Sequence, residues 1–154
     1  MLVNIKIQTN IISLSHKYKI KKLIFIGSSC IYPKNSKTPI KESELLKGEL
    51  EPTNQWYALT KIHGVKMCEA YNKQYNSNFS CVMPTNLFGL NDKYGENSHV
   101  IPALLKRIHQ SKVKKDPYVK VWGDGTPKRE FMYADDGAKI ICRILFNKKY
   151  FKLI

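Results

Sequence analysis

The sequence predicts an open α/β fold with a parallel sheet, and three features indicate it. Residues 22–27 form a short, continuous apolar run that ends in glycine, as a strand covered on both faces would. Residues 79–83 form a second such run, which Pro84 stops. A long helical pattern separates the two runs, and the order strand, helix, strand implies a right-handed parallel crossover. Ligands of such sheets bind beyond the carboxyl ends of the strands.

The remaining elements follow from periodicity and turn residues. Residues 4–18 carry apolar side chains at helical spacing and predict a helix before the first strand. The long loop over residues 32–54 contains three prolines, and Thr53 or Asn54 can cap the helix predicted over residues 55–76. Further on, the patterns predict helices over residues 100–110 and 135–146, a strand over residues 118–122 and a turn at residues 123–125.

The composition is that of one globular domain with an excess of basic residues. Of the 154 residues, 43% are apolar and 25% are charged, which is ordinary for folded proteins. The formal net charge of +14 would attract phosphate groups. The basic residues are mostly lysine and are scattered, which indicates solvated faces rather than a nucleic-acid groove. A nucleic-acid partner would rest on net charge alone, and we do not expect one.

The spacing of the cysteines and the length of the apolar runs indicate the cellular compartment of the protein. The four cysteines show neither CxxC nor Cys/His ligand spacing, so we expect no metal site, reduced thiols and a cytoplasmic protein. No apolar run approaches the roughly 20 residues that span a bilayer. Residues 1–10 also lack the apolar core of a signal peptide. We therefore expect no membrane partner.

A tyrosine and a lysine on the predicted helix can do proton chemistry. Tyr57 and Lys61 are four residues apart, so their side chains share one face. An ammonium group beside a phenol favours the phenolate, which helps the pair to exchange protons near neutral pH. Ser28, in the loop after the first strand, can hydrogen-bond the same substrate oxygen. Taken alone, the Tyr-x-x-x-Lys spacing also arises by chance in any helix rich in these residues.

Five longer motifs follow one another along nearly the whole chain. They are GSSCIYP at residues 27–33, EPTN at 51–54, VMPTNL at 82–87, NSHVIPA at 97–103 and WGDGTPKREF at 122–131. In that order they resemble the GDP-L-fucose synthase family, within the extended short-chain dehydrogenases/reductases. The resemblance implies a partial Rossmann-like, doubly wound parallel sheet. Residues 1–90 would be the C-terminal half of the NADP-binding domain, and residues 91–154 would start the substrate-binding region.

The resemblance also implies a reaction. Members carry out 3,5-epimerisation and then NADPH-dependent 4-keto reduction of GDP-4-dehydro-6-deoxy-D-mannose to GDP-L-fucose. Tyr57 would donate the proton in the reduction, Lys61 would orient the nicotinamide ribose, and Ser28 would bind the keto oxygen. Cys30 and His99 match the acid/base pair of the epimerisation, and a thiol and an imidazole suit proton exchange near pH 7.

The resemblance assigns binding residues as well. The cofactor NADP(H) would contact Ile26, Gly27, Ser28, Ser29, Tyr57, Lys61, Pro84, Thr85, Asn86, Leu87 and His99. The GDP-sugar substrate would be held by Arg107, Trp122 and Arg129, because guanidinium groups suit a diphosphate and an indole ring offers a stacking face. By analogy with the superfamily, the helices at residues 4–18 and 55–76 would form a homodimer.

One family motif is not found in this sequence. The turn G-x-x-G-x-x-G, which presents a helix N-terminus to the cofactor pyrophosphate, is formed by none of the eight glycines. We therefore expect a central fragment, from a split gene, a frameshift or a partial gene model, whose activity is impaired and which needs a complementary fragment. Two alternatives stay open: another NAD(P)-dependent nucleotide-sugar epimerase or dehydratase, and a non-catalytic remnant.

Overall fold

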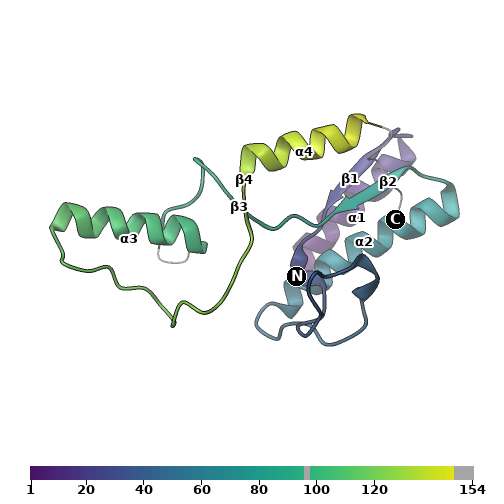
Figure 1. The fold of residues 1–154 in the computed structure, drawn as a ribbon. Helices are drawn as coiled ribbons and strands as arrows, with labels where there is room; N and C mark the ends of the chain where they lie inside the picture. Colours follow the sequence, from purple (N-terminus) through teal and green to yellow (C-terminus); the bar gives the residue numbers. More distant parts are fainter. Residues whose placement is uncertain (96–97, 148–154) are drawn as a thin grey trace. The chain divides into compact units, whose positions relative to one another are not determined.

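The computed structural model describes residues 1–95 and 98–147. It separates into two compact units (Figure 1). The first unit comprises Met1–Thr85 and the described residues from Lys139 onward, and the second is Asn86–Ala138. Within the described ranges, no helix is long and apolar enough to cross a membrane.

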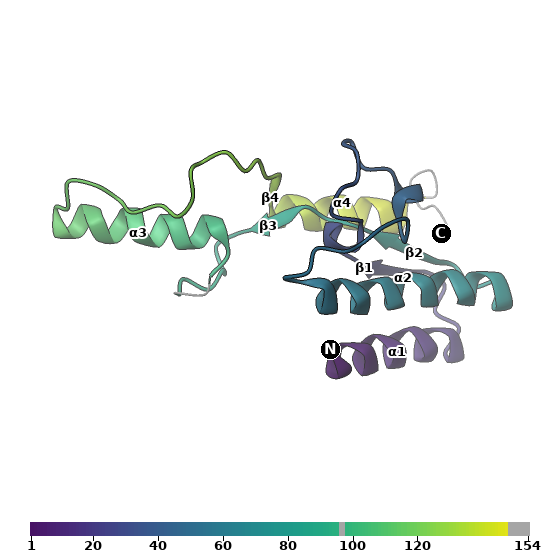
Figure 2. The ribbon, with the colours of Figure 1, turned by 90° about the horizontal axis from the view of Figure 1, so that it is seen from below.

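The first unit is built on the predicted crossover. Its main elements, in chain order, are α1 (Leu2–Lys17), β1 (Leu23–Ile26), α2 (Gln55–Tyr75) and β2 (Phe79–Val82). The two strands pair in parallel, with Leu23 opposite Phe79 and Ile26 opposite Val82. Helices α1 and α2 run side by side on one face of this sheet (Figure 2). The predicted helices, strands and parallel pairing of this region are therefore confirmed.

Two small clusters of buried side chains join the helices to the sheet. Ile12 of α1, Cys68 of α2 and Phe79 of β2 form the first cluster. Ile31, Ile62 and Val65 form the second. Ala58, Ile62 and Val65, which periodicity places on one face of the helix, are all buried. The apolar face of α2 thus carries most of the core of this unit.

A glycine lets α2 approach β1 closely. A Cβ atom at Gly64 would lie 2.7 Å from both Cε1 and Cε2 of Phe25, well inside van der Waals contact. The aromatic ring of Phe25 therefore occupies the space that any larger residue at position 64 would need. This close packing holds the middle of α2 against the strand that leads to the candidate site.

Polar contacts fix the far end of α2. Asn72 donates from Nδ2 to the carbonyl oxygen of Phe79 at 2.7 Å and accepts the Phe79 N–H at Oδ1 at 3.0 Å. One amide thereby satisfies both backbone groups of the first residue of β2. Because Phe79 is 1% exposed, these groups have little access to water.

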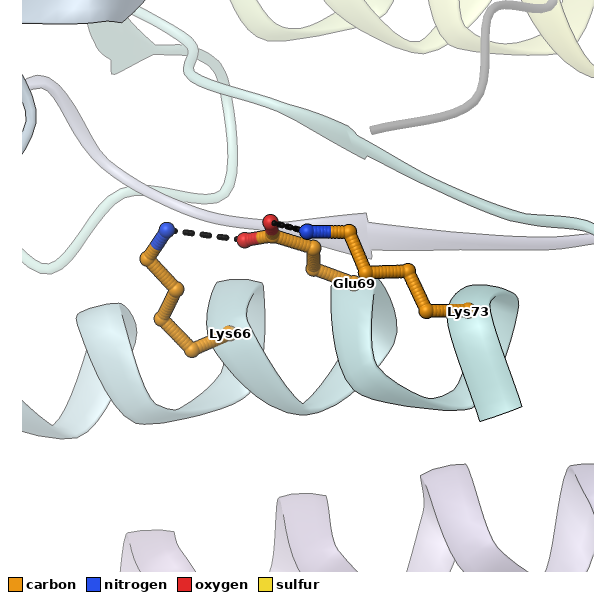
Figure 3. Close-up of polar contacts among 3 residues, drawn as sticks. All are labelled: Lys66, Glu69 and Lys73. Carbon is orange, nitrogen blue, oxygen red and sulfur yellow. Dashed lines mark hydrogen bonds and ion pairs between the residues drawn. The ribbon is translucent and has the colours of Figure 1, made fainter. Parts of the chain in front are cut away.

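A charged triad runs along α2 (Figure 3). The Glu69 carboxylate accepts from the ammonium groups of Lys66 and Lys73, each at 2.7 Å. The hydrogen bond with Lys66 and, after it, the hydrogen bond with Lys73 are the main causes that lower the pKa of Glu69 to about 2. The pairs span three and four residues, which is the spacing at which helical side chains meet.

The segment between β1 and α2 contains two short 3-10 turns that the sequence patterns do not predict, Ser29–Ile31 and Glu42–Glu44. Ile31 is completely buried and anchors the loop against α2. Asn54 is the residue before α2, as predicted for a cap. Its side chain, however, makes no capping hydrogen bond, so the predicted capping role is wrong.

The second unit contains a parallel pair of very short strands, β3 (Asn86–Phe88) and β4 (Phe131–Tyr133), which the sequence patterns do not predict. Helix α3 (Val100–Lys114) confirms the predicted helix and extends it by about one turn. Helix α4 (Ala134–Phe146) begins in this unit and confirms the last predicted helix.

The strand predicted over residues 118–122 is wrong, because this segment has no regular structure. Three of its four apolar side chains are turned to solvent: Tyr118 is 78%, Val121 58% and Trp122 74% exposed, whereas Val119 is half-buried. Alternation alone does not make a strand where no neighbouring strand offers backbone partners. The turn that follows is confirmed, since Gly123 and Gly125 both have positive φ angles, of 83° and 80°.

Candidate active site

The tyrosine and lysine of α2 lie at the carboxyl end of β1. Lys61 donates from Nζ to the backbone carbonyl of Ile26 at 2.7 Å, which fixes the ammonium group beside the last residue of the strand. The Nζ atom is 5.8 Å from the centroid of the Tyr57 ring. The predicted shared face is thus present, and it points to the strand end from which Ser28 follows.

The surroundings of Lys61 are partly apolar. Its Nζ atom lies 5.3 Å from the centroid of the Phe25 ring, and partial burial lowers the pKa of Lys61. Tyr57 is 42% exposed, so its phenol group remains accessible to a ligand. An accessible phenol next to a fixed cation can donate a proton to an oxygen on a bound molecule.

Ser28 and Cys30 occupy the tight turn after β1. The Oγ atom of Ser28 accepts the Cys30 backbone N–H at 3.3 Å, which stabilises the 3-10 turn at Ser29–Ile31. Both side chains are half-buried. The Ser28 hydroxyl hydrogen is not used by this bond and is free to point to a ligand.

Cys30 has a polar neighbour. Asn54 donates from Nδ2 to the Cys30 sulfur at 3.2 Å. The Oδ1 atom of the same amide is buried and has no hydrogen-bond partner within residues 1–95 and 98–147. Asn54 therefore connects the beginning of α2, three residues before Tyr57, with the candidate acid/base thiol.

A pocket of about 350 Å³ between α1 and β1 reaches Tyr57 and Lys61 of α2. Ile26, Tyr57 and Lys61 line one part of it, and Ile7 and Ile11 of α1 line another. Three of the residues predicted to contact a cofactor are therefore brought to one cavity. The backbone N–H of Gly27 donates to the Val82 carbonyl at 2.8 Å, so this predicted contact residue joins the carboxyl ends of β1 and β2 just before Pro84.

In the second unit, a smaller pocket of about 60 Å³ collects four predicted residues from three different motifs. Asn86 and Leu87 come from β3, His99 is the N-cap residue of α3, and Arg129 lies just before β4. His99 and Arg129 are exposed. An imidazole and a guanidinium group thus face the same small cavity.

The other predicted substrate residues form a pair of their own in this unit. The guanidinium carbon of Arg107 lies 4.5 Å from the centroid of the Trp122 ring, a stacking cation–π contact. Arg107 also donates from Nη1 to the Lys120 carbonyl at 3.5 Å. A cation and an aromatic surface presented together suit a nucleotide, which carries both a diphosphate and a flat base.

The predicted residues divide between the two units. Ser28, Ser29, Cys30, Tyr57 and Lys61, like Pro84 and Thr85, belong to the first, whereas Asn86, Leu87, His99, Arg107, Trp122 and Arg129 belong to the second. Ser29 is exposed, and Pro84 and Thr85 are half-buried. Within the described ranges, no group of three or more His, Cys, Asp or Glu side chains could hold a metal ion.

Two residues of the site, Asn54 and Phe25, are not predicted from the sequence. Asn54 stands out only as a possible helix cap, although its place three residues before Tyr57 is a signal that could have been used. Phe25 is one apolar residue within a strand, and only the structure shows that its ring packs against Gly64 and lies near the Lys61 ammonium group.

Comparison with known proteins gives relatives over nearly the whole chain. Over 136 residues the chain is 55% identical to a GDP-L-fucose synthase of Escherichia coli, and over 135 residues 54% identical to a putative GDP-L-fucose synthase of Arabidopsis thaliana. These matches cover 88% and 87% of this chain but 42% and 41% of the relatives. The chain thus spans about two fifths of the length of these relatives.

Solved structures agree on the fold. A GDP-L-fucose synthetase from Naegleria fowleri bound to NADP superimposes with a TM-score of 0.84 at 27% identity, covering 98% of this chain and 54% of that one. A GDP-mannoheptose C4 reductase from Campylobacter jejuni with NADP bound gives a TM-score of 0.80 at 33% identity, covering 90% and 50%. The fold of the chain is therefore α/β and Rossmann-like, and only part of that fold is present.

The family is assigned from a match that extends over nearly the whole chain. Residues 1–151 match the NAD dependent epimerase/dehydratase family. Relatives that exceed 50% identity match 88% and 87% of the chain. The chain belongs to the NAD dependent epimerase/dehydratase family.

Proposed function

We propose that this chain carries the catalytic core of a GDP-L-fucose synthase. The reaction is 3,5-epimerisation followed by NADPH-dependent 4-keto reduction of GDP-4-dehydro-6-deoxy-D-mannose to GDP-L-fucose. The observation that carries the proposal is the 2.7 Å hydrogen bond from Lys61 Nζ to Ile26 O. It sets the Tyr-x-x-x-Lys pair at the strand end that leads to Ser28, within a chain 55% identical to a curated GDP-L-fucose synthase.

In the reduction, Tyr57 and Ser28 act on the 4-keto oxygen. The Ser28 hydroxyl donates a hydrogen bond to that oxygen, and the accessible Tyr57 phenol donates the proton that turns it into a hydroxyl group. The nearby Lys61 ammonium stabilises the phenolate that is left.

In the epimerisation, Cys30 and His99 exchange protons at C3 and C5. Both carbons lie next to the 4-keto group, whose electron withdrawal makes their hydrogens acidic. One group removes a proton from one face, and the other returns a proton to the opposite face, so that the centre is inverted. A thiol and an imidazole both change protonation state near neutral pH in suitable surroundings.

The residues at the end of β1 fit the nicotinamide half of NADP(H). The Lys61 ammonium group has three donors and uses one for Ile26, which leaves others for ribose hydroxyl groups. Bound there, the cofactor would supply the hydride for C4. Residues 1–90 would form the C-terminal half of the cofactor domain, and none of their glycines forms the turn that cradles the pyrophosphate.

Residues 91–154 would start the substrate-binding region. Arg107 and Trp122 present a cation against an aromatic ring, and Arg129 adds a second guanidinium group near His99. These groups match the diphosphate and the base of a GDP-sugar.

Two protein partners complete the proposal. Within the described residues β1 is paired on one edge only, so a complementary fragment can add a strand beside Leu23–Ile26. A second copy would pack on α1, whose Leu2, Val3, Ile7, Ile11 and Leu14 are each at least 47% exposed. We place the enzyme in the cytoplasm, where the four unpaired thiols would stay reduced.

Cofactor binding is the first test. NADPH is titrated into the purified chain by calorimetry, alone and with the N-terminal segment of a GDP-L-fucose synthase supplied in trans. We expect binding only with the added segment, and Lys61→Met should abolish it while Lys73→Met, on the exposed side of the same helix, should not. No binding under either condition would favour a non-catalytic remnant.

The epimerase half is tested by isotope exchange. A full-length chimera replaces the matched 136 residues of the Escherichia coli relative with those of this chain. With the 4-keto substrate in D₂O and no NADPH, deuterium should enter at C3 and C5. Cys30→Ser should stop this exchange, whereas Cys142→Ser, at an exposed thiol, should leave it intact. Exchange that survives Cys30→Ser would reject the assignment of Cys30.

A further inference from the structure

We propose that Asn54 is the positioning residue that holds and activates the Cys30 thiol by donating a hydrogen bond from its amide to the sulfur. The contact is direct, with Asn54 Nδ2 at 3.2 Å from Cys30 Sγ. The inference rests on the proposed acid/base role of Cys30, and it assigns a function to a residue that sequence patterns explain only as a helix cap.

The fold itself does not account for the Asn54 side chain. Asparagine is favoured before a helix because its side chain can accept a backbone N–H of the first turn, yet Asn54 makes no such bond. Its backbone carbonyl, by contrast, accepts the N–H groups of Tyr57 and Ala58 at 3.0 Å each, and any residue could supply that carbonyl. Among the described residues, the Cys30 sulfur is the partner of the amide group.

The amide also carries an energetic cost. Its Oδ1 atom is buried without a partner within residues 1–95 and 98–147, and a buried acceptor in that state destabilises the folded protein. An apolar side chain of similar size would avoid the cost. A polar group retained at a cost next to a reactive side chain is typical of functional sites.

The chemistry of the contact explains what the amide does. A thiolate is a strong acceptor, and an N–H donor stabilises it more than it stabilises the neutral thiol. Asn54 therefore holds the sulfur in place and offers a donor to the thiolate form, which is the form able to remove a proton. Its place at the start of α2 also ties the thiol to the helix that carries Tyr57, so the groups of the two reaction stages share one support.

The test measures thiol reactivity and needs neither substrate nor cofactor. The complete chain is alkylated with iodoacetamide at pH 7 and pH 9.5, and the rate at Cys30 is followed by peptide mass spectrometry. The rate at pH 7 is divided by the rate at pH 9.5, and this ratio cancels changes in access to the sulfur. Exposed Cys142 in the same molecule is the internal reference. A failure here concerns Asn54 alone, because the role of Cys30 is tested separately by deuterium exchange.

We expect Asn54→Ala to lower the ratio at Cys30 by about fivefold, because the thiolate loses its donor. Asn54→Asp keeps the shape of the side chain but places a carboxylate beside the sulfur, so it should lower the ratio further. Thr53→Ala, at the neighbouring exposed residue, should change nothing. Circular dichroism establishes whether each variant is folded. If the Ala variant is not folded, the result for the isosteric Asp variant decides the test. An unchanged or higher ratio in whichever of the two variants is folded overturns the proposal, because the thiolate would then lose nothing when the amide donor is removed.

Discussion

Gly64→Ala tests whether close packing of α2 on β1 supports the site. The added methyl group would lie 2.7 Å from two carbon atoms of the Phe25 ring, so either the ring or the helix must move. Overpacking of this kind costs about 1–3 kcal/mol. Alanine in a helix interior recovers about 1 kcal/mol relative to glycine. We therefore expect a net loss of up to about 2 kcal/mol in the free energy of unfolding.

Gly137→Ala is the matched control. There the new Cβ atom would meet the Leu87 Cδ2 atom at 3.2 Å, which is the end of a flexible side chain. The helix gain of about 1 kcal/mol should then remain, so that this variant is as stable as the parent or more so.

Urea unfolding followed by far-ultraviolet circular dichroism gives the stabilities, and a double-mutant cycle with Phe25→Leu assigns the cause. Removing the ring should turn the effect of Gly64→Ala from destabilising to neutral or stabilising. Should Gly64→Ala prove at least as stable as the parent with Phe25 in place, the close approach of α2 to β1 would not be the constraint we describe.

Three further variants probe other contacts. Asn72→Leu leaves the backbone groups of Phe79 without partners and should cost about 2 kcal/mol in urea unfolding, whereas a loss below about 0.5 kcal/mol would show that these bonds are dispensable. Glu69→Gln should remove a contribution that is present above pH 4.5 and lost as the pH falls through about 2, since the pKa of Glu69 is lowered in the folded state. The triad is partly exposed, so we expect less than about 1 kcal/mol, and stability curves of parent and variant that do not converge at low pH would contradict the ion pairing. Ile7→Asp with Ile11→Asp should convert a dimer to a monomer in light scattering if a second copy packs on α1, and an unchanged mass would reject that face.

The crossover could be predicted because its signals are local and strong. Two continuous apolar runs and a long helix between them leave little choice of topology, and the structure has this arrangement. Strands β3 and β4 have three residues each, too few for periodicity to detect. The opposite error occurred at residues 118–122, where alternation exists but backbone partners do not.

The candidate site likewise has features that the sequence predicts and features that it does not. The spacing of Tyr57 and Lys61 fixes their shared face, which the structure confirms. The contact between Asn54 and Cys30 joins residues 24 apart through a loop without periodic structure, and no local pattern encodes it. The space that Phe25 takes from position 64 likewise depends on how the helix docks on the strand.

Reduction of the 4-keto sugar tests the central claim most directly. The full-length chimera is supplied with NADPH and GDP-4-dehydro-6-deoxy-D-mannose, and NADPH oxidation is followed by absorbance. We expect oxidation that depends on the sugar, falls at least about a hundredfold in Tyr57→Phe and persists in Tyr75→Phe, at an exposed tyrosine of the same helix. Equal rates in the Tyr57→Phe and Tyr75→Phe chimeras would contradict the assignment of Tyr57 as the proton donor.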